Sequence, residues 1–454
     1  MPVMISTKRN LTEGSLGKNL LVLSIPMILG MSLQTAFYVV DMIFVGFLGS
    51  AAIAAVSMAG LVILILITLG VGLSSATTAL VSRAIGAGDQ AQGAHVTIQS
   101  FVLATLISVV VGVLGYSYAE SIYKLLGATP EVIEAGLGFL KISFAGVIAF
   151  FFMFIITAAL RGAGDAILPV KILALSTLLN IVLDPLMIFG WGPFPRLGVN
   201  GAAYATLLSI SLSVSVALYL LLKGSTLIQI SLHKVRLDPR VIWQLIKIAI
   251  PGSAETLLRS VSRLALMKMV AQYGTPAIAA FGIGGSRLDM AVTLPILGIS
   301  LSTATLVGQN LGAGKPDRAE KSAWVAVRWG MLLMLIVAAI FFTLAPRVIR
   351  VFDENPEVVS LGTSYIRTTT LSYLFLGAAM ILGRAFSGAG DTVPPMVTAA
   401  VALWGVQIPL AYFLARHTQL QIRGIWLAIP ISHTLNAALL AAWFKAGWWK
   451  LKKV

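Results

Sequence analysis

Four acidic residues lie inside long apolar runs of this chain: Asp41, Asp184, Glu255 and Asp289. A charged side chain at the centre of a bilayer costs about 2.5–3.5 kcal/mol on insertion scales, so such residues usually bind an ion, a proton or a partner charge. Each of the four is therefore a candidate functional residue.

Polar side chains precede Asp41 and Asp184 at helical spacing. The two stripes are Gln34, Tyr38 and Asp41 in the first apolar run and Thr177, Asn180 and Asp184 in the fifth. Two carboxylates beside amide and hydroxyl oxygens could bind one cation, with Thr206 as a further ligand. They could equally share one proton, because carboxylates at close range disfavour double ionisation. Alternatively, both acids only hydrogen-bond neighbouring helices or lie among headgroups, since both are near the ends of their runs.

A second group of charges lies in the seventh and eighth runs. Glu255, Arg259 and Arg263 follow one another at i+4 steps, and Arg287 and Asp289 come later. We expect Glu255 to neutralise Arg259 and Asp289 to neutralise Arg287. These charges either make the interior of the C-terminal half polar or basic, or bridge helices near the membrane interfaces.

The first run contains Pro26 and Gly30. Proline removes one backbone hydrogen bond of a helix, and glycine lowers the stiffness beside it. This segment is therefore either a working hinge or a static kink.

Flexible thioethers suit a pocket that repacks around varied apolar ligands, and neighbouring polar side chains could fix a ligand in place. The candidate substrate contacts are Gln34, Tyr38, Met27, Met31, Met153, Thr157 and Thr177. Ordinary helix packing is the alternative for the methionines.

No pattern for catalysis is visible in the chain. It has no cysteine, Walker A loop, metal-ligand cluster or hydrolase triad. We expect no enzyme, no catalytic residue, no cofactor and no metal beyond a possible Na⁺ at the cation site.

GAGD occurs at Gly162–Asp165 and Gly388–Asp391, and intramembrane aspartyl proteases use a similar motif. Because it occurs twice, at helix ends where glycine permits a tight turn, we reject that remote alternative.

The elements that position these residues are predicted by composition. Hydrophobic residues are 58% of the 454, charged residues are 11%, and the mean hydropathy is +0.94. Such values are typical of an integral membrane protein. A bilayer needs roughly 20 apolar residues per helix. Twelve runs qualify: 19–45, 51–82, 92–115, 132–160, 166–189, 200–223, 241–271, 277–308, 319–344, 357–385, 394–414 and 424–446. The first run is too long for a signal peptide, so we expect a retained span.

The formal charge of +15 is concentrated in three stretches, Met1–Lys18, Lys223–Lys247 and the tail from Lys445. With twelve spans all three lie on one side, which the positive-inside rule makes cytoplasmic. We therefore expect both termini in the cytoplasm, contact with membrane lipids and no nucleic-acid partner. Trp443, Trp448 and Trp449 are expected to anchor the last helix at the interface.

An internal repeat organises the spans. GAGD recurs at a separation of 226 residues, as do Gly86–Gly88 with Gly312–Gly314 and Pro130–Val132 with Pro356–Val358. We expect an all-α protein with two six-helix bundles related by a pseudo-twofold axis along the membrane normal. The expected bundles are 1–223 and 241–454, joined by a cytoplasmic linker, 224–240. Asp41 and Asp184 have no acidic counterpart in the second copy.

Motifs along the whole chain resemble the multidrug and toxic compound extrusion transporters, and among them the DinF-like branch. The resembling pieces are Ile25-Pro26, Asp41, Ser82–Gly88, Leu160–Asp165 (LRGAGD), Asn180, Asp184-Pro185, Val199–Thr206, Val307–Gly314 and Phe386–Asp391 (FSGAGD). The resemblance implies a multi-pass protein of the prokaryotic inner membrane with an outward V-shaped cleft. It implies efflux of amphipathic, often cationic drugs in exchange for inward H⁺ or Na⁺, and a monomer is expected. It also places the family's cation site on Asp41, Asn180 and Asp184.

A lipid-linked oligosaccharide flippase of the same wider superfamily is the second reading, because such proteins usually carry basic residues in the cleft. Arg259, Arg263 and Arg287 keep this alternative open. In another branch of the family an acid on the seventh span couples to sodium, but the adjacent arginines compete for Glu255 here. The physiological substrate and the choice between H⁺ and Na⁺ are not encoded in residue spacing.

Overall fold

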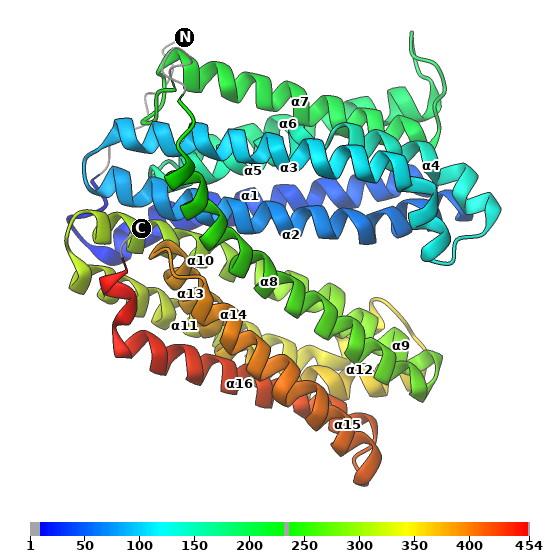
Figure 1. Cartoon of the computed structure of the whole chain (residues 1–454). Helices are drawn as coiled ribbons and strands as arrows, with labels where there is room; N and C mark the ends of the chain where they lie inside the picture. The colour runs from blue at the N-terminus through cyan, green and yellow to red at the C-terminus, as the bar shows by residue number, and fades with distance from the viewer. Residues whose placement is uncertain (1–9, 231–235, 453–454) are drawn as a thin grey trace. The chain divides into compact units, whose positions relative to one another are not determined.

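The structure is a computed structural model that describes residues 10–230 and 236–452, and these residues form helices and loops without a strand (Figure 1). Ten helices, or helices with a short continuation, are long and apolar enough to cross a membrane. Two further pairs of bent helices bring the number of spans to twelve when each pair is taken as one. The prediction of an all-α membrane protein with twelve spans is confirmed.

The first half of the chain forms seven helices: α1 (Leu16–Gly46), α2 (Ser50–Gly86), α3 (Gln90–Leu125), α4 (Pro130–Ala145), α5 (Val147–Gly162), α6 (Ile167–Phe189) and α7 (Val199–Lys223). The second half begins with α8 (Pro239–Val270), η2 (Ala271–Tyr273), α9 (Thr275–Gly282), the π-helical η3 (Ile283–Leu288), α10 (Asp289–Gly312) and α11 (Pro316–Arg350). It continues with α12 (Pro356–Thr369), η4 (Thr370–Ser372), α13 (Tyr373–Gly388), α14 (Val393–Ala399), the π-helical η5 (Ala400–Gln407), α15 (Ile408–His417), α16 (Ile422–Ala446) and η6 (Trp448–Leu451).

Two spans that we expected to be continuous helices are bent. The run 132–160 breaks at Gly146, where α4 and α5 meet at 49°, and the run 357–385 breaks at η4 with an angle of 56°. A Cβ atom at position 146 would come within 2.2 Å of the end of the Leu207 side chain on α7, so a larger residue there would displace that side chain. Hydrophobic periodicity does not register such a bend, because both arms are equally apolar.

The helices pack as two units. Unit 1 contains Leu29–Ile250, and unit 2 contains Leu11–Ile28 together with the described residues from Pro251 onward. The division therefore falls inside α1, directly after an Ile-Pro-Met-Ile segment, and inside α8, directly before Pro251. The first turns of α1 pack with unit 2, while its remaining turns pack with unit 1.

The GAGD repeats form the same helix-ending turn in both units. Gly164 and Gly390 have φ of +92° and +78°, and the backbone N–H groups of Asp165 and Asp391 donate to carbonyls five residues earlier. This is a Schellman-type C-cap, which requires the left-handed conformation that glycine adopts without strain. The Asp165 carboxylate also accepts from the backbone N–H groups of Ile167 and Leu168, at 3.0 Å each, so it caps the start of α6. Its role is structural, which agrees with the rejection of a protease.

A close helix crossing is also repeated. A Cβ atom on Gly162 of α5 would lie 3.1 Å from the Thr78 carbonyl oxygen on α2. A Cβ atom on Gly388 of α13 would lie 2.2 Å from the Ala304 carbonyl oxygen on α10. Small residues allow membrane helices to approach closely, so both units use glycine to bring equivalent helices together.

One of the three tryptophans predicted to anchor the tail, Trp449, differs from its prediction, whereas Trp443 and Trp448 are exposed. Trp449 is fully buried, stacks on Phe444 at 4.4 Å and donates its indole N–H to the Phe444 carbonyl, so it is a packing residue and not an interfacial anchor. Lys450 holds the tail against the start of α11 through Glu320 at 2.6 Å and Asp317 at 3.3 Å. The hydrogen bond to Glu320 is the main cause that raises the pKa of Lys450 above its ordinary value.

We predict that Gly388→Ala destabilises the protein by about 1–3 kcal/mol, the usual cost of overpacking, because backbone on α10 must move. Gly162→Ala should cost less, since its Cβ contact is only tight. Gly60→Ala, on α2 with nothing within 4 Å of the added atom, is the matched control and should be neutral or slightly stabilising. Thermal unfolding in detergent checks this order, and equal midpoints for all three variants would contradict the repeated crossing.

Candidate functional site

The predicted cation-binding residues lie in unit 1 on α1, α6 and α7. Asn180 and Asp184 of α6 have no exposed surface. The Asn180 Nδ2 atom donates to Asp184 Oδ1 at 3.0 Å and to Thr206 Oγ1 of α7 at 3.4 Å. Helices α6 and α7 pack against each other, so tertiary structure adds Thr206 to a pair that helical spacing alone brings together.

Three oxygen atoms of this group are buried and accept no hydrogen bond. They are Asp41 Oδ1, Asn180 Oδ1 and Asp184 Oδ2. Asp41 of α1 also interacts electrostatically with Asp184. A buried polar atom without a partner costs about 1–3 kcal/mol, and more when it is charged. Three such acceptors in one unit make these residues candidates for binding a proton or a cation.

The ligand set of this site is two carboxylates, an amide oxygen and a hydroxyl. Among the described residues, no three His, Cys, Asp or Glu side chains come together as a metal site. Oxygen ligands suit hard cations, whereas transition metals favour imidazole and thiolate. The arrangement can bind a proton shared between acids, or a small cation such as Na⁺.

Other predicted contacts of unit 1 lie on α1, α5 and α6. The Thr177 hydroxyl donates to the Leu173 carbonyl at 2.9 Å, and the Thr157 hydroxyl donates to the Met153 carbonyl at 2.9 Å. Each oxygen keeps a lone pair that could accept from a ligand. Met31 and Gln34 are partly buried on α1, and the side chain of Tyr38 lies outside the described residues.

Met27 and the hinge residues lie where α1 is divided. Met27 is 4% exposed, and its Sδ atom accepts from the Ser302 hydroxyl of α10 at 3.3 Å, so it packs inside unit 2. Pro26 belongs to unit 2 as well, whereas Gly30 belongs to unit 1. A Cβ atom on Gly30 would lie 3.3 Å from Val170 of α6, so glycine also lets α1 approach that helix.

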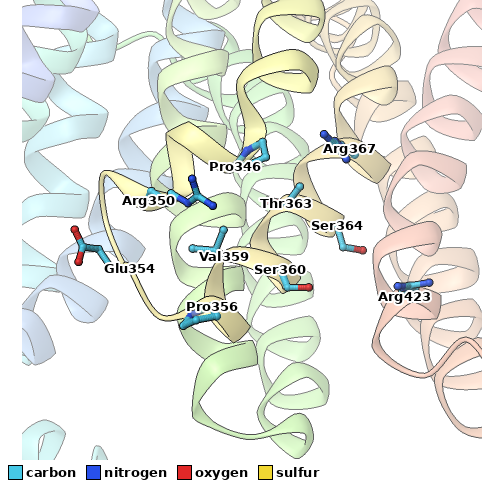
Figure 2. A pocket seen from close by; sticks show the side chains of 10 residues that line it. All are labelled: Pro346, Arg350, Glu354, Pro356, Val359, Ser360, Thr363, Ser364, Arg367 and Arg423. Carbon is cyan, nitrogen blue, oxygen red and sulfur yellow. The ribbon is translucent and has the colours of Figure 1, made fainter.

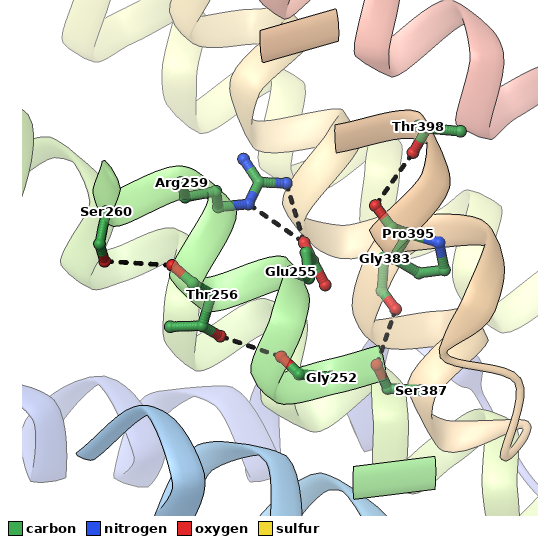
Figure 3. A network of polar contacts seen from close by, with 9 residues as sticks. All are labelled: Gly252, Glu255, Thr256, Arg259, Ser260, Gly383, Ser387, Pro395 and Thr398. Carbon is green, nitrogen blue, oxygen red and sulfur yellow. Dashed lines mark hydrogen bonds and ion pairs between the residues drawn. The ribbon is translucent and has the colours of Figure 1, made fainter. Parts of the chain in front are cut away.

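The first charged cluster of unit 2 lies on α8. The Nε and Nη2 atoms of Arg259 donate to Glu255 Oε1 at 3.1 and 2.9 Å, as predicted from the i+4 spacing. Figure 3 shows the guanidinium folded back on the carboxylate one turn earlier, beside hydroxyl groups that bond to their own helices. The Glu255 carboxylate is thus paired with Arg259.

A second cluster is centred on Asp289 at the start of α10. Its carboxylate accepts from the hydroxyls of Tyr373 at 2.9 Å and Tyr365 at 3.2 Å, and Arg263 lies 3.9 Å away. We had expected Arg287 as the partner, but its side chain lies outside the described residues, and the partners seen are on α8, α12 and α13. Residues adjacent in sequence on a helix diverge in direction, which favours partners from other helices.

Comparison with known proteins identifies this architecture. The family model described as MatE matches residues 26–186 and 251–413, one segment in each repeat. The chain belongs to the multidrug and toxic compound extrusion (MATE) family.

Relatives of this MATE protein extend over almost its whole length. The probable multidrug resistance protein YoeA of Bacillus subtilis is 27% identical over 443 residues, which cover 97% of this chain and 96% of YoeA. An FAD transporter of Shewanella oneidensis is 29% identical over 432 residues, covering 94% of both chains. The solved structure of a MOP superfamily transporter from Pyrococcus furiosus, described as having a binding pocket of reverse polarity, matches with a TM-score of 0.91. It is 27% identical and covers 99% of this chain and all of its own.

Several polar residues of this MATE protein escaped the sequence analysis. Tyr365 and Tyr373 gave no signal, because tyrosine is common in apolar runs and its hydroxyl partner is 76 or 84 residues distant. Arg384 of α13 did carry a signal in the sequence, because an arginine inside a predicted span is a functional candidate by default. It lies in the electrostatic range of Glu255 and Arg259. His433 of α16 bonds to the Ser372 hydroxyl at 3.1 Å.

We predict that Tyr373→Phe lowers the thermal stability of this MATE protein, because a hydrogen bond to a charged group contributes about 1.5–3 kcal/mol. In an Asp289→Asn background the same change should cost much less, since the two groups act as a pair. Tyr412→Phe, on an exposed ring of α15, is the control. Unfolding midpoints of the four cycle members in detergent measure the coupling. Strictly additive losses would show that the tyrosine acts elsewhere.

Proposed function

We propose that this protein is a secondary active multidrug exporter that exchanges amphipathic, often cationic organic compounds for inward-moving H⁺ or Na⁺. The observation that carries the proposal is the set of buried acceptor oxygens on Asp41, Asn180 and Asp184. Acceptors with no protein donor bind a proton or a cation readily and release it when the surroundings change. The multidrug resistance name of YoeA supports the substrate class.

The coupling ion binds to Asp41, Asn180 and Asp184, with Thr206 as a further oxygen ligand. A compound binds beside it, against Met31, Met153, Gln34, Tyr38, Thr157 and Thr177. Thioethers adapt to varied apolar shapes, and the amide and hydroxyl groups orient polar substituents. When the acids release their ion, charge and space become available to a cationic drug. When they bind it again, the drug loses its counter-charge.

The first helix transmits this change through Pro26 and Gly30. The missing backbone donor at Pro26 leaves the Val22 carbonyl without its helical partner, so the helix bends there at low cost. The observation that supports a hinge is the division of α1 between two packing units directly after this segment. Protonation of Asp41 changes its hydrogen bonding and biases the bend, which closes the space that held the drug.

The exporter acts as a monomer in the inner membrane of a prokaryotic cell, with both termini in the cytoplasm. The basic stretches at the two termini and in the linker support this orientation. Two bundles, 1–223 and 241–454, joined by the linker 224–240, alternate in access to the two sides. The charges Glu255, Arg259, Arg263, Arg287 and Asp289 shape the polarity of the second bundle.

We predict that Asp41→Asn reduces gradient-driven drug accumulation in everted vesicles to the level of vesicles without the protein. Asparagine keeps the size and hydrogen-bonding shape of the side chain but cannot take up the coupling charge. Asp184→Asn should be nearly as damaging, and the double variant no worse than either, because groups that act as a unit are non-additive. Glu131→Gln, an exposed acid of α4, is the matched control. Wild-type accumulation by the Asp41→Asn variant would refute the assignment.

We predict that Pro26→Ala lowers transport several-fold while drug affinity at high pH stays within a few-fold of wild type. Alanine restores the helical donor and straightens α1, which shifts a conformational equilibrium without removing a ligand. Pro130→Ala, at the first turn of α4 where no helical bond is missing, is the control. Spin or fluorescence labels on α1 should report one conformation at all pH values in the variant. Full transport with an unchanged pH response of the labels would reduce Pro26 to a static kink.

A further inference from the structure

A groove of about 500 Å³ lies in unit 2 and shares no lining residue with the charged clusters described above (Figure 2). Its polar lining is three arginines and three hydroxyl side chains: Arg350, Arg367, Arg423, Ser360, Thr363 and Ser364. Glu354, on the loop after α11, is the single acid of the lining. The groove therefore carries a net positive charge at neutral pH.

Three helices build the groove. Ser360, Thr363, Ser364 and Arg367 occupy positions i, i+3, i+4 and i+7 of α12, so they lie on one stripe. Arg350 ends α11, and Arg423 lies in the first turn of α16. Helix α12 contacts both of these helices, so Arg367 lies on the stripe and the other two cations come from neighbouring helices.

The three arginines have no carboxylate within 4 Å in the part of the chain that the structure describes. In the same unit, Arg259 and Arg263 each have an acidic partner. The Thr363 Oγ1 atom in the groove is buried and has no hydrogen-bond partner. An open set of guanidinium donors around an unsatisfied hydroxyl matches a ligand that is rich in acceptor oxygens.

The groove lies at the end of unit 2 opposite the tail. Helix α11 runs for 35 residues, or about 52 Å, from the Lys450 partner Asp317 to Arg350. With the termini in the cytoplasm, this is the outer end, where the positive-inside rule gives no reason for an excess of arginine. The presence of the three groove arginines at this end therefore has another explanation.

We propose that this groove binds a phosphate group at the outer membrane surface. Arginine presents parallel N–H donors that match phosphate oxygens in bidentate geometry, and the serine and threonine hydroxyls supply further donors. The phosphodiester of an anionic phospholipid and free inorganic phosphate share this chemistry. The binding requires neither Asp41 nor Asp184, so it stands or falls separately from cation coupling.

The test measures binding to the full-length protein in detergent. One arm titrates phosphatidylglycerol against diacylglycerol, which lacks the phosphate, in mixed micelles, and the other titrates inorganic phosphate against chloride at constant ionic strength. Thermal shift and native mass spectrometry report binding. The variants are Arg367→Gln with Arg423→Gln, and the corresponding double Lys variant, which keeps the charges but loses the bidentate donors. Arg347→Gln, an exposed arginine three residues before Arg350 and outside the lining, is the matched control.

Phosphate-bearing ligand should bind wild type and Arg347→Gln alike. The double Gln variant should bind at least about tenfold more weakly, and the double Lys variant should lie between, because each lost charge-assisted bond costs a sizeable fraction of the affinity. A response to phosphatidylglycerol alone identifies a lipid site, and a response to inorganic phosphate identifies a soluble ligand. Equal affinity of wild type and the double Gln variant, or an equal loss in Arg347→Gln, would overturn the proposal, as would the absence of binding in both arms. Unliganded unfolding midpoints near wild type verify that the variants are folded.

Discussion

The constraint on which this structure depends is that polar atoms inside a membrane protein must find partners within the protein. Helices satisfy the backbone, and most side-chain hydroxyls donate to the carbonyl one turn earlier, as Thr157 and Thr177 do. Asp41 Oδ1, Asn180 Oδ1 and Asp184 Oδ2 are exceptions, because no residue that the structure describes donates to them. Unpartnered oxygens on two acids of one membrane bundle are candidates for binding an ion or a proton that arrives and leaves. The proposed exchange of ions for drugs follows from that property.

The two repeats share a scaffold and differ in what it carries. The GAGD turns and the glycine crossings at Gly162 and Gly388 recur in both units, so they belong to the fold. Asp41 and Asp184 in unit 1 each keep an oxygen without a partner, whereas Asp289 in unit 2 is held by two tyrosines and an arginine. A buried carboxylate with hydrogen-bond partners on several helices holds those helices together, whereas one with an unpartnered oxygen is able to bind a ligand. This contrast supports Asp41 and Asp184 as the coupling residues.

Interactions within one helix or one apolar run could be predicted from the sequence, whereas contacts between different helices could not. The twelve spans were predictable because a bilayer requires long apolar runs. The Glu255–Arg259 pair and the proximity of Asn180 to Asp184 were predictable because both follow from helical spacing. The close approach of Gly146 to Leu207 of α7 is a contact between helices. The partners of Asp289 and the burial of Trp449 also depend on packing, and spacing along one helix carries no information on either.

The most direct test of the central claim measures ion movement driven by the drug itself. Proteoliposomes loaded with drug, without any imposed pH or sodium gradient, are diluted into drug-free medium, while internal pH and internal Na⁺ are followed in parallel. The account predicts that drug efflux moves one of these cations in the opposite direction in a fixed ratio, and that Asp41→Asn abolishes the ion movement. Drug efflux through the wild-type protein with no countermovement of either cation would contradict it.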